Sequence, residues 1–155
     1  MSVPGDGLPQ LQSWLPLLQE SLAREGRFRW QLAGKSMEPT LRDGCQIEIV
    51  PIRGAISLGD VVVFAGGSAL VAHRLVHRSG RYLVTQGDGR REPDRWLQPT
   101  QLVGRVDKAC LDSRIIWPSR GEKVLRWRWI GRAYVLAGVR RMRRLLPGRN
   151  QGERA

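Results

Sequence analysis

Short apolar runs separated by glycine-containing polar steps fill the middle of the chain. From residue 27 to residue 111 these runs are rich in valine and isoleucine and partly alternate with polar residues, which is the period of a β-strand. Asp-Gly, Gly-Asp, Gly-Gly and Ser-Gly steps divide them, and no stretch keeps a long helical period. The pattern predicts a compact, mainly β body with strands at Phe28–Ala33, Gln46–Val50, Val61–Phe64, Leu70–His77, Tyr82–Gln86 and Leu102–Ala109. The fourth and fifth of these are predicted to form a hairpin.

Helical spacing flanks this body on both sides. Apolar residues between Pro9 and Glu25 recur at three- and four-residue intervals, which predicts an amphipathic helix that Gly26 ends. This helix is expected to pack on the body, and the alternative is a membrane or partner surface. A second, basic helix is predicted over Glu122–Leu146. The chain therefore divides into a disordered lead plus helix (1–26), a β domain (27–117) and a basic helix with its tail (118–155).

The charge is concentrated at the C-terminal end. The 155 residues carry a formal net charge of +12, and the segment from Arg114 onward holds twelve basic and two acidic residues, or +10 of that total. Such a segment suits an anionic partner. Its tryptophans and arginines favour an anionic membrane surface. A helix packed on the body with a solvated basic face is the main alternative, and nucleic acid is the partner least favoured.

The chain shows neither a secretory signal nor a membrane span. The best candidate span, Trp127–Val139, is too short and contains arginines. The two cysteines, Cys45 and Cys110, lie far apart in apolar runs and are expected to be reduced. These features predict a cytoplasmic or peripheral membrane protein.

A serine on a bend is the first sign of chemistry. Ser36 lies between Gly34 and Pro39, which interrupt strand pairing, so the backbone can turn and present both the hydroxyl and nearby amides. A serine hydroxyl is a weak nucleophile until a base takes its proton and a third group orients that base. An ordinary turn at the end of a strand would have the same pattern.

Histidine and aspartate residues that could serve as this base and its partner follow later in the chain. His73 lies within a predicted strand and is preferred as the base over His77, which alternation places on the same face but nearer the turn. Asp88, in a Gly-Asp-Gly step, and Asp94, six residues later, are the candidate orienting groups. Each has an ordinary structural explanation: a core histidine, a turn aspartate and a loop charge.

Four motifs together resemble the type I signal peptidases, in the clan that also holds the self-cleaving SOS repressors. The resemblance covers about residues 34–106, roughly half of the chain, and is carried by Ser36-Met37-x-Pro39-Thr40, Leu58-Gly59-Asp60-Val61-Val62-Val63-Phe64, Ala72-His73-Arg74, and Thr85-Gln86-Gly87-Asp88 with Asp94. Histidine rather than lysine as the base is similar to the endoplasmic-reticulum and archaeal-like branch. The resemblance implies a coiled β-sheet or partial barrel.

This resemblance also implies the roles of the site residues. Ser36 is the nucleophile, His73 the base and Asp94 the orienting group, while Asp88 holds its loop or shares that role. Backbone amides at the bend, chiefly of Ser36 and Met37, would hold the oxyanion because Gly34 stands where some members carry a hydroxyl. An extended substrate is implied beside a strand edge, with Val61–Phe64 or Phe28–Ala33 as candidates. Typical members also begin with a transmembrane anchor, and at this place the sequence predicts a short amphipathic helix instead.

The predicted function is therefore a serine endopeptidase that cleaves a leader or signal segment from a precursor peptide or protein, without a cofactor. The alternatives are a DNA-binding regulator related to the self-cleaving repressors, and a catalytically silent binding module of the same fold. A zinc set of His73, His77, Cys45 and Cys110 is disfavoured because it lacks close-pair spacing. Lys35 and Lys108 are alternative bases, and Lys35 is disfavoured because it adjoins Ser36.

Overall fold

The computed structural model describes residues 11–66, 68–118 and 131. The predicted disordered lead and nearly all of the predicted basic helix lie outside these residues, so the expectations placed on them stay predictions. All the described strands fall within the predicted β domain of 27–117. Nowhere in the described part of the chain is a helix both long and apolar enough to cross a bilayer.

The described residues form a mainly β structure with one antiparallel sheet of seven strands and one α-helix, as the sequence pattern predicts in outline. The helix α1, Leu15–Glu25, follows a short 3-10 turn at Leu11–Trp14 and ends at Gly26, whose φ of 76° gives a left-handed cap. A second 3-10 turn, Pro99–Gln101, precedes the sixth strand. The strands are β1 Phe28–Gln31, β2 Gln46–Val50, β3 Val61–Gly66, β4 Ala69–Ser79, β5 Tyr82–Gln86, β6 Leu102–Leu111 and β7 Arg114–Trp117.

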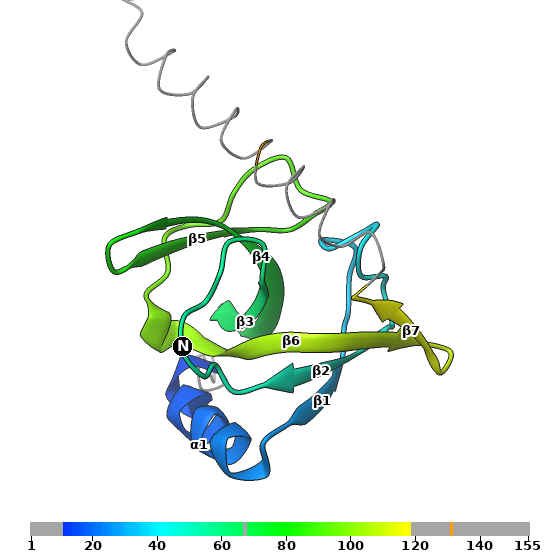
Figure 1. Ribbon diagram of the computed structural model, residues 1–155, viewed down its shortest axis with the longest axis horizontal. Helices are drawn as coiled ribbons and strands as arrows, with labels where there is room; N and C mark the ends of the chain where they lie inside the picture. Colours follow the sequence, from blue (N-terminus) through cyan, green and yellow to red (C-terminus); the bar gives the residue numbers. More distant parts are fainter. Residues whose placement is uncertain (1–10, 67, 119–130, 132–155) are drawn as a thin grey trace, which may run out of the picture.

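The sheet is open and has the strand order β1-β2-β6-β3-β4-β5, with β7 paired to the end of β6. Figure 1 shows β6 crossing the molecule, with β1 and β2 on one side and β3, β4 and β5 curled on the other. The β4–β5 hairpin is present as predicted. The suggestion that Val61–Phe64 supplies a free edge is wrong, because β3 pairs with both β4 and β6.

Two apolar clusters hold the sheet and the helix together. The first lies under α1 and includes Leu22 of the helix. It also includes Met37 and Leu41 from the bend between β1 and β2 that carries Ser36, called here the serine bend. The second fills the curl of β3, β4 and β5. Leu22 is only 3% exposed, and Leu15 and Leu18 pack against the first cluster, so α1 packs on the body as expected.

Gly104 on β6 is where α1 approaches the sheet most tightly. A Cβ placed there would lie 2.7 Å from a methyl carbon of Leu22, a methyl carbon of Ile49 and the carbonyl oxygen of Val50. Gly104→Ala is therefore expected to lower the free energy of unfolding by about 1–3 kcal/mol, because the helix or the sheet must shift. Urea denaturation measures the change, and Ser79→Ala at the exposed end of β4 is the control. An unchanged midpoint would contradict the close seating of α1.

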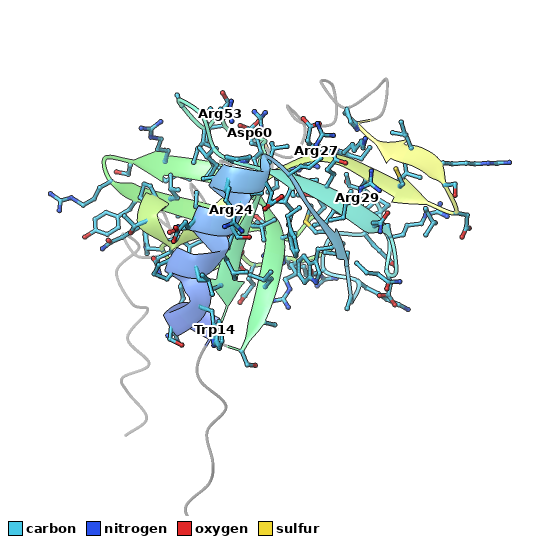
Figure 2. The ribbon with its side chains drawn as sticks, turned by 90° about the horizontal axis from the view of Figure 1, so that it is seen from below. Trp14, Arg24, Arg27, Arg29, Arg53 and Asp60 are labelled. Carbon is cyan, nitrogen blue, oxygen red and sulfur yellow. The ribbon has the colours of Figure 1, made fainter. Side chains whose placement is uncertain are left out.

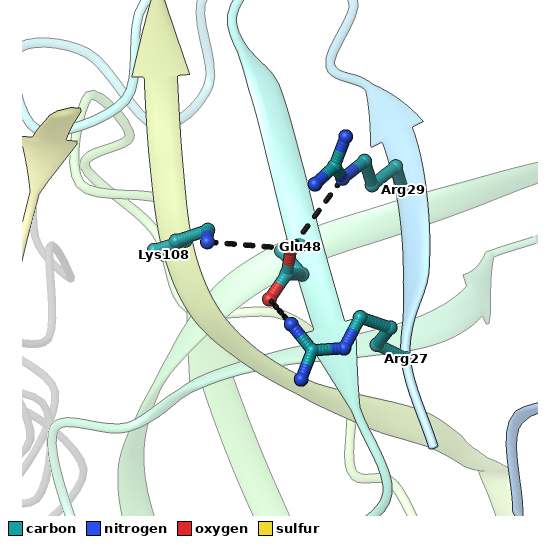
Figure 3. Close-up of polar contacts among 4 residues, drawn as sticks. All are labelled: Arg27, Arg29, Glu48 and Lys108. Atoms are coloured by element: carbon teal, nitrogen blue, oxygen red, sulfur yellow. Dashed lines mark hydrogen bonds and ion pairs between the residues drawn. The ribbon is translucent and has the colours of Figure 1, made fainter. Parts of the chain in front are cut away.

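A buried carboxylate joins β1, β2 and β6 on the other part of the sheet. The side chain of Glu48 is 4% exposed and lies 3.1 Å from Nη1 of Arg27, 3.4 Å from Nε of Arg29 and 3.5 Å from Nζ of Lys108, as Figure 3 shows. Burial raises the pKa of the Glu48 carboxyl, but the charges of Lys108 and Arg27 outweigh it. The pKa therefore lies below its ordinary value of 4.5.

This cluster makes the free energy of unfolding depend on pH in the acidic range. Because the folded-state pKa of Glu48 is below the unfolded value, its contribution is complete above about pH 4.5 and is lost as the pH falls through the folded-state pKa. Glu48→Gln is thus expected to cost on the order of 1 kcal/mol at pH 7 and less at pH 3, measured by urea denaturation. Glu25→Gln, at a carboxylate that is 61% exposed, is the control. A cost for Glu48→Gln that does not change with pH would contradict the electrostatic account.

Candidate active site

The serine bend between β1 and β2 is held in place by its neighbours on both sides. Gly34 has a φ of 94° and donates its N–H to Oδ1 of Asp43 at 2.7 Å. Met37 and Leu41 are fully buried and are joined by a backbone hydrogen bond of 3.0 Å. Ser36 lies between these two anchors and is half-buried. The bend therefore fixes its backbone in the core while the serine stays accessible.

Ser36, His73 and Asp94 form one hydrogen-bonded row. The Oγ of Ser36 lies 3.0 Å from Nε2 of His73, and Nδ1 of His73 lies 2.6 Å from Oδ2 of Asp94. Because a carboxylate only accepts, Nδ1 carries the proton and donates it to Asp94, which leaves Nε2 to accept from the serine hydroxyl. The order matches the arrangement that activates a serine for attack.

His73 is held in this orientation by buried surroundings. It lies on β4, is 2% exposed, and its ring meets that of Phe64 on β3 edge-on at 6.1 Å between centroids. The side chain of Asp94 is fixed in turn by Oγ1 of Thr85, which donates to Oδ2 at 2.7 Å. The backbone N–H of Asp94 donates to the carbonyl of Thr85 at 2.8 Å. His73 and Asp94 are thus both positioned by the hairpin β4–β5.

Asp88 is close in sequence to Asp94 but has a different partner. Its carboxylate accepts from Nε and Nη2 of Arg74 at 2.9 and 2.7 Å, and Nη1 of Arg74 donates to the carbonyl of Gly59 at 2.9 Å. The Arg74 and Asp88 side chains are 0% and 1% exposed. Of the two candidate aspartates, Asp94 contacts His73, and Asp88 instead forms a buried, two-pronged ion pair.

This ion pair anchors a turn that touches the serine bend. The N–H of Gly89 donates to the carbonyl of Ser36 at 2.9 Å. A Cβ on Gly87 would collide with that same carbonyl and lie 3.0 Å from Nε2 of His73, and a Cβ on Gly89 would lie 2.9 Å from the carbonyl of Lys35. Both glycines are therefore required by close approach, and the Gly-Asp-Gly step joins the bend that carries Ser36 to β4.

His77 does not compete for the serine. The β4–β5 register pairs Leu75 with Thr85 and then His77 with Val84, so one residue is skipped between them. Such an irregularity reverses the alternation, and the prediction that His77 shares a face with His73 is therefore wrong. His77 is half-buried and more exposed than His73, and the centroid of its ring lies 6.1 Å from that of Trp96.

The other residues considered for chemistry lie elsewhere. Lys108 pairs with Glu48, and Lys35 is exposed. Cys45 is buried and Cys110 half-buried, and both are free thiols, with burial raising the pKa of Cys45 above its ordinary 9.0. Among the described residues, no group of three or more histidine, cysteine, aspartate and glutamate side chains is placed to hold a metal ion.

Two functional positions were missed by sequence reasoning, although both lie inside motifs that it singled out. Thr85 opens the Thr-Gln-Gly-Asp run and Arg74 follows His73, but no spacing rule says that a strand threonine orients an aspartate or that an arginine is buried.

No protein-family model matches the sequence, and no curated protein matches it either. The geometry of the row and the order of its motifs therefore carry the functional proposal.

Proposed function

We propose that this protein is a serine endopeptidase of the signal-peptidase type, which cleaves a leader or signal segment from a precursor peptide or protein through an acyl-enzyme. The observation that carries the proposal is the row itself, with Ser36 Oγ 3.0 Å from Nε2 of His73 and Nδ1 of His73 2.6 Å from Asp94. These three residues are distant in the chain, and a turn serine, a core histidine and a loop aspartate have no structural need to meet.

In the proposed reaction, Oγ of Ser36 attacks the carbonyl carbon of the scissile peptide while Nε2 of His73 takes the hydroxyl proton. Asp94 stabilises the imidazolium that forms. When the C–N bond breaks, His73 gives the same proton to the leaving amine, and an ester to Ser36 remains. Water, deprotonated by His73, then attacks the ester and releases Ser36.

Backbone amides of the serine bend are proposed to stabilise the negative oxygen of the tetrahedral intermediate. Among the described residues, the N–H groups of Ser36 and Met37 donate no hydrogen bond, whereas the carbonyls of both residues do accept one. The complete burial of the Met37 side chain fixes the orientation of its peptide unit. Preorganised N–H donors of this kind are worth about 10²–10³ in rate each.

The substrate is proposed to bind as an extended segment beside β1. Among the described strands, β1 pairs only with β2, so the other edge of Phe28–Gln31 offers main-chain groups for strand addition. This strand leads directly into the bend that carries Ser36. Small side chains near the cut are implied by the resemblance to signal peptidases, and the curl of β3, β4 and β5 agrees in outline with their partial barrel.

Cleavage of synthetic leader peptides tests the proposal. Peptides with an apolar run followed by small residues are incubated with the wild-type protein and with Ser36→Ala, and the products are identified by mass spectrometry. We expect cleavage by the wild type only, together with an adduct on Ser36 after treatment with an activated peptide ester. Ser13→Ala, at an exposed serine, is the control and should cleave normally.

Two outcomes would overturn the proposal. Equal cleavage by wild type and Ser36→Ala would place the activity elsewhere. Failure of the wild type both to cleave any leader peptide and to acylate at Ser36 would leave a binding module that keeps the fold. Circular dichroism of the two proteins shows whether the substitution has altered the sheet.

A further inference from the structure

A cavity of about 420 Å³ lies between α1, the β2–β3 connection and the β4–β5 hairpin, apart from the Ser36 row. Its floor is made of buried leucines of three elements, Leu22, Leu83 and Leu102, and its walls include Ile52 and Ile56. None of Ser36, His73 and Asp94 lines it. A volume in this range with mostly apolar walls is typical of a small-molecule site.

The polar groups of this cavity favour an anion. Among the described residues that line it, Arg78 alone carries a charge, and its guanidinium has no hydrogen bond or ion pair within the described part of the chain. Gln19, the other polar lining side chain with a nitrogen donor, uses that nitrogen on the carbonyls of Thr100 and Leu102, at 3.0 and 2.6 Å. Arg78 is therefore left as the group that a ligand would meet.

Two more arginines lie beside cavity-lining positions. Arg24 follows Ala23 on α1, and Arg53 lies between Ile52 and Gly54 in the β2–β3 connection. Figure 2 shows Arg24 and Arg53 on the face of the molecule that α1 covers. Arg24 is paired with Glu25 at 3.3 Å, but no acidic side chain lines the cavity among the described residues. Within the described lining, the charge of Arg78 is therefore not offset by a carboxylate.

The backbone around the cavity argues against an extended peptide as the ligand. The edge of β5 beside the cavity is already occupied, because Leu83 and Leu97 exchange both backbone hydrogen bonds at 2.8 Å. An added strand would find no free main-chain groups at this point. The cavity offers a ligand apolar walls and one cation. These features complement an aliphatic chain with an anionic head group.

We propose that this cavity binds a single-chain aliphatic anion, with the chain on the leucine floor and the head on Arg78. The head is a carboxylate or a phosphate, because a guanidinium pairs with either. The site is independent of the peptidase proposal, since it shares no lining residue with the Ser36 row.

Titration calorimetry with dodecanoate, below its micelle concentration, tests the site. We expect one saturable site in the full chain, weakened about tenfold or more by Arg78→Gln, because a charge-assisted hydrogen bond is lost. Arg81→Gln, on the same hairpin but not lining the cavity, is the matched control and should bind normally. Neutral dodecanol should bind with the same affinity to wild type and Arg78→Gln.

A second variant and a second ligand complete the test. Ala55→Trp, at an exposed lining position, should block both ligands without disturbing the core. Lysophosphatidylglycerol replaces dodecanoate to show whether the head is a phosphate or a carboxylate, and tight binding of either supports the proposal. No saturable binding of either anion, equal losses in Arg78→Gln and Arg81→Gln, or binding unaffected by Ala55→Trp would overturn it. Binding of an apolar peptide in place of both anions would also overturn it.

Discussion

Replacing Asp94 by asparagine is expected to lower kcat for leader-peptide cleavage by about 10⁴-fold while leaving the fold intact. Asp94 Oδ2 accepts from Nδ1 of His73 at 2.6 Å and from Oγ1 of Thr85 at 2.7 Å. An asparagine can turn its NH₂ group toward Nδ1, which selects the tautomer whose Nε2 carries the proton. That tautomer cannot take the proton of Ser36.

Steady-state kinetics and circular dichroism measure this effect together. Asp107→Asn, at an exposed aspartate on β6, is the matched control and should keep wild-type kinetics. Thr85→Val keeps the carboxylate but removes one of its donors, so its kcat should fall between those of the wild type and Asp94→Asn. Wild-type kcat in Asp94→Asn would show that the carboxylate does not act on the base.

Loss of Arg74 is expected to cause the largest change in stability. Arg74→Met leaves the Asp88 carboxylate, whose side chain is 1% exposed, without its two-pronged partner. Breaking a buried pair on one side costs about 3–5 kcal/mol, because an uncompensated charge stays in the interior. Urea denaturation measures the loss, and Arg81→Met, at an exposed arginine of the adjoining turn, should change stability by less than about 0.5 kcal/mol.

The double variant keeps this prediction testable if Arg74→Met does not fold. Arg74→Met combined with Asp88→Leu removes both charges, so it should be more stable than Arg74→Met alone. A double variant that is no more stable than the single one would show that packing, rather than the ion pair, accounts for the cost.

The strands that could be predicted were those with strong apolar runs, and the one that was missed had a weak turn signal. Residues Arg114–Trp117 form β7 behind a two-residue turn at Asp112 and Ser113, whose φ values of 47° and 65° are both positive. Two-residue turns with positive φ at both positions usually contain asparagine or glycine. The sequence Asp-Ser therefore does not predict such a turn. The predicted β domain therefore reaches residue 117, but its last segment was not predicted to be a strand.

The site shows a similar division between local and tertiary information. Ser36 and His73 were identified from their residue types and order, and Asp94 was preferred to Asp88 because of the resemblance to signal peptidases. The structure brings these three residues together. The facing of His77 was predicted incorrectly because alternation assumes an uninterrupted register, whereas β4 skips a residue after Leu75. The Arg74–Asp88 ion pair forms because these two side chains are buried together. The spacing of residues in one sequence does not predict which side chains share a buried position.

The row draws its members from three separate segments: the bend after β1, the middle of β4 and the loop after β5. On the proposed chemistry, a nascent chain in which Asp94 has not yet been made is inert, because its nucleophile precedes both the base and the group that orients it. Hydrolytic activity would thus begin only after the β4–β5 hairpin has formed beside the bend that carries Ser36. An incompletely synthesised chain would therefore not cleave other proteins near the ribosome.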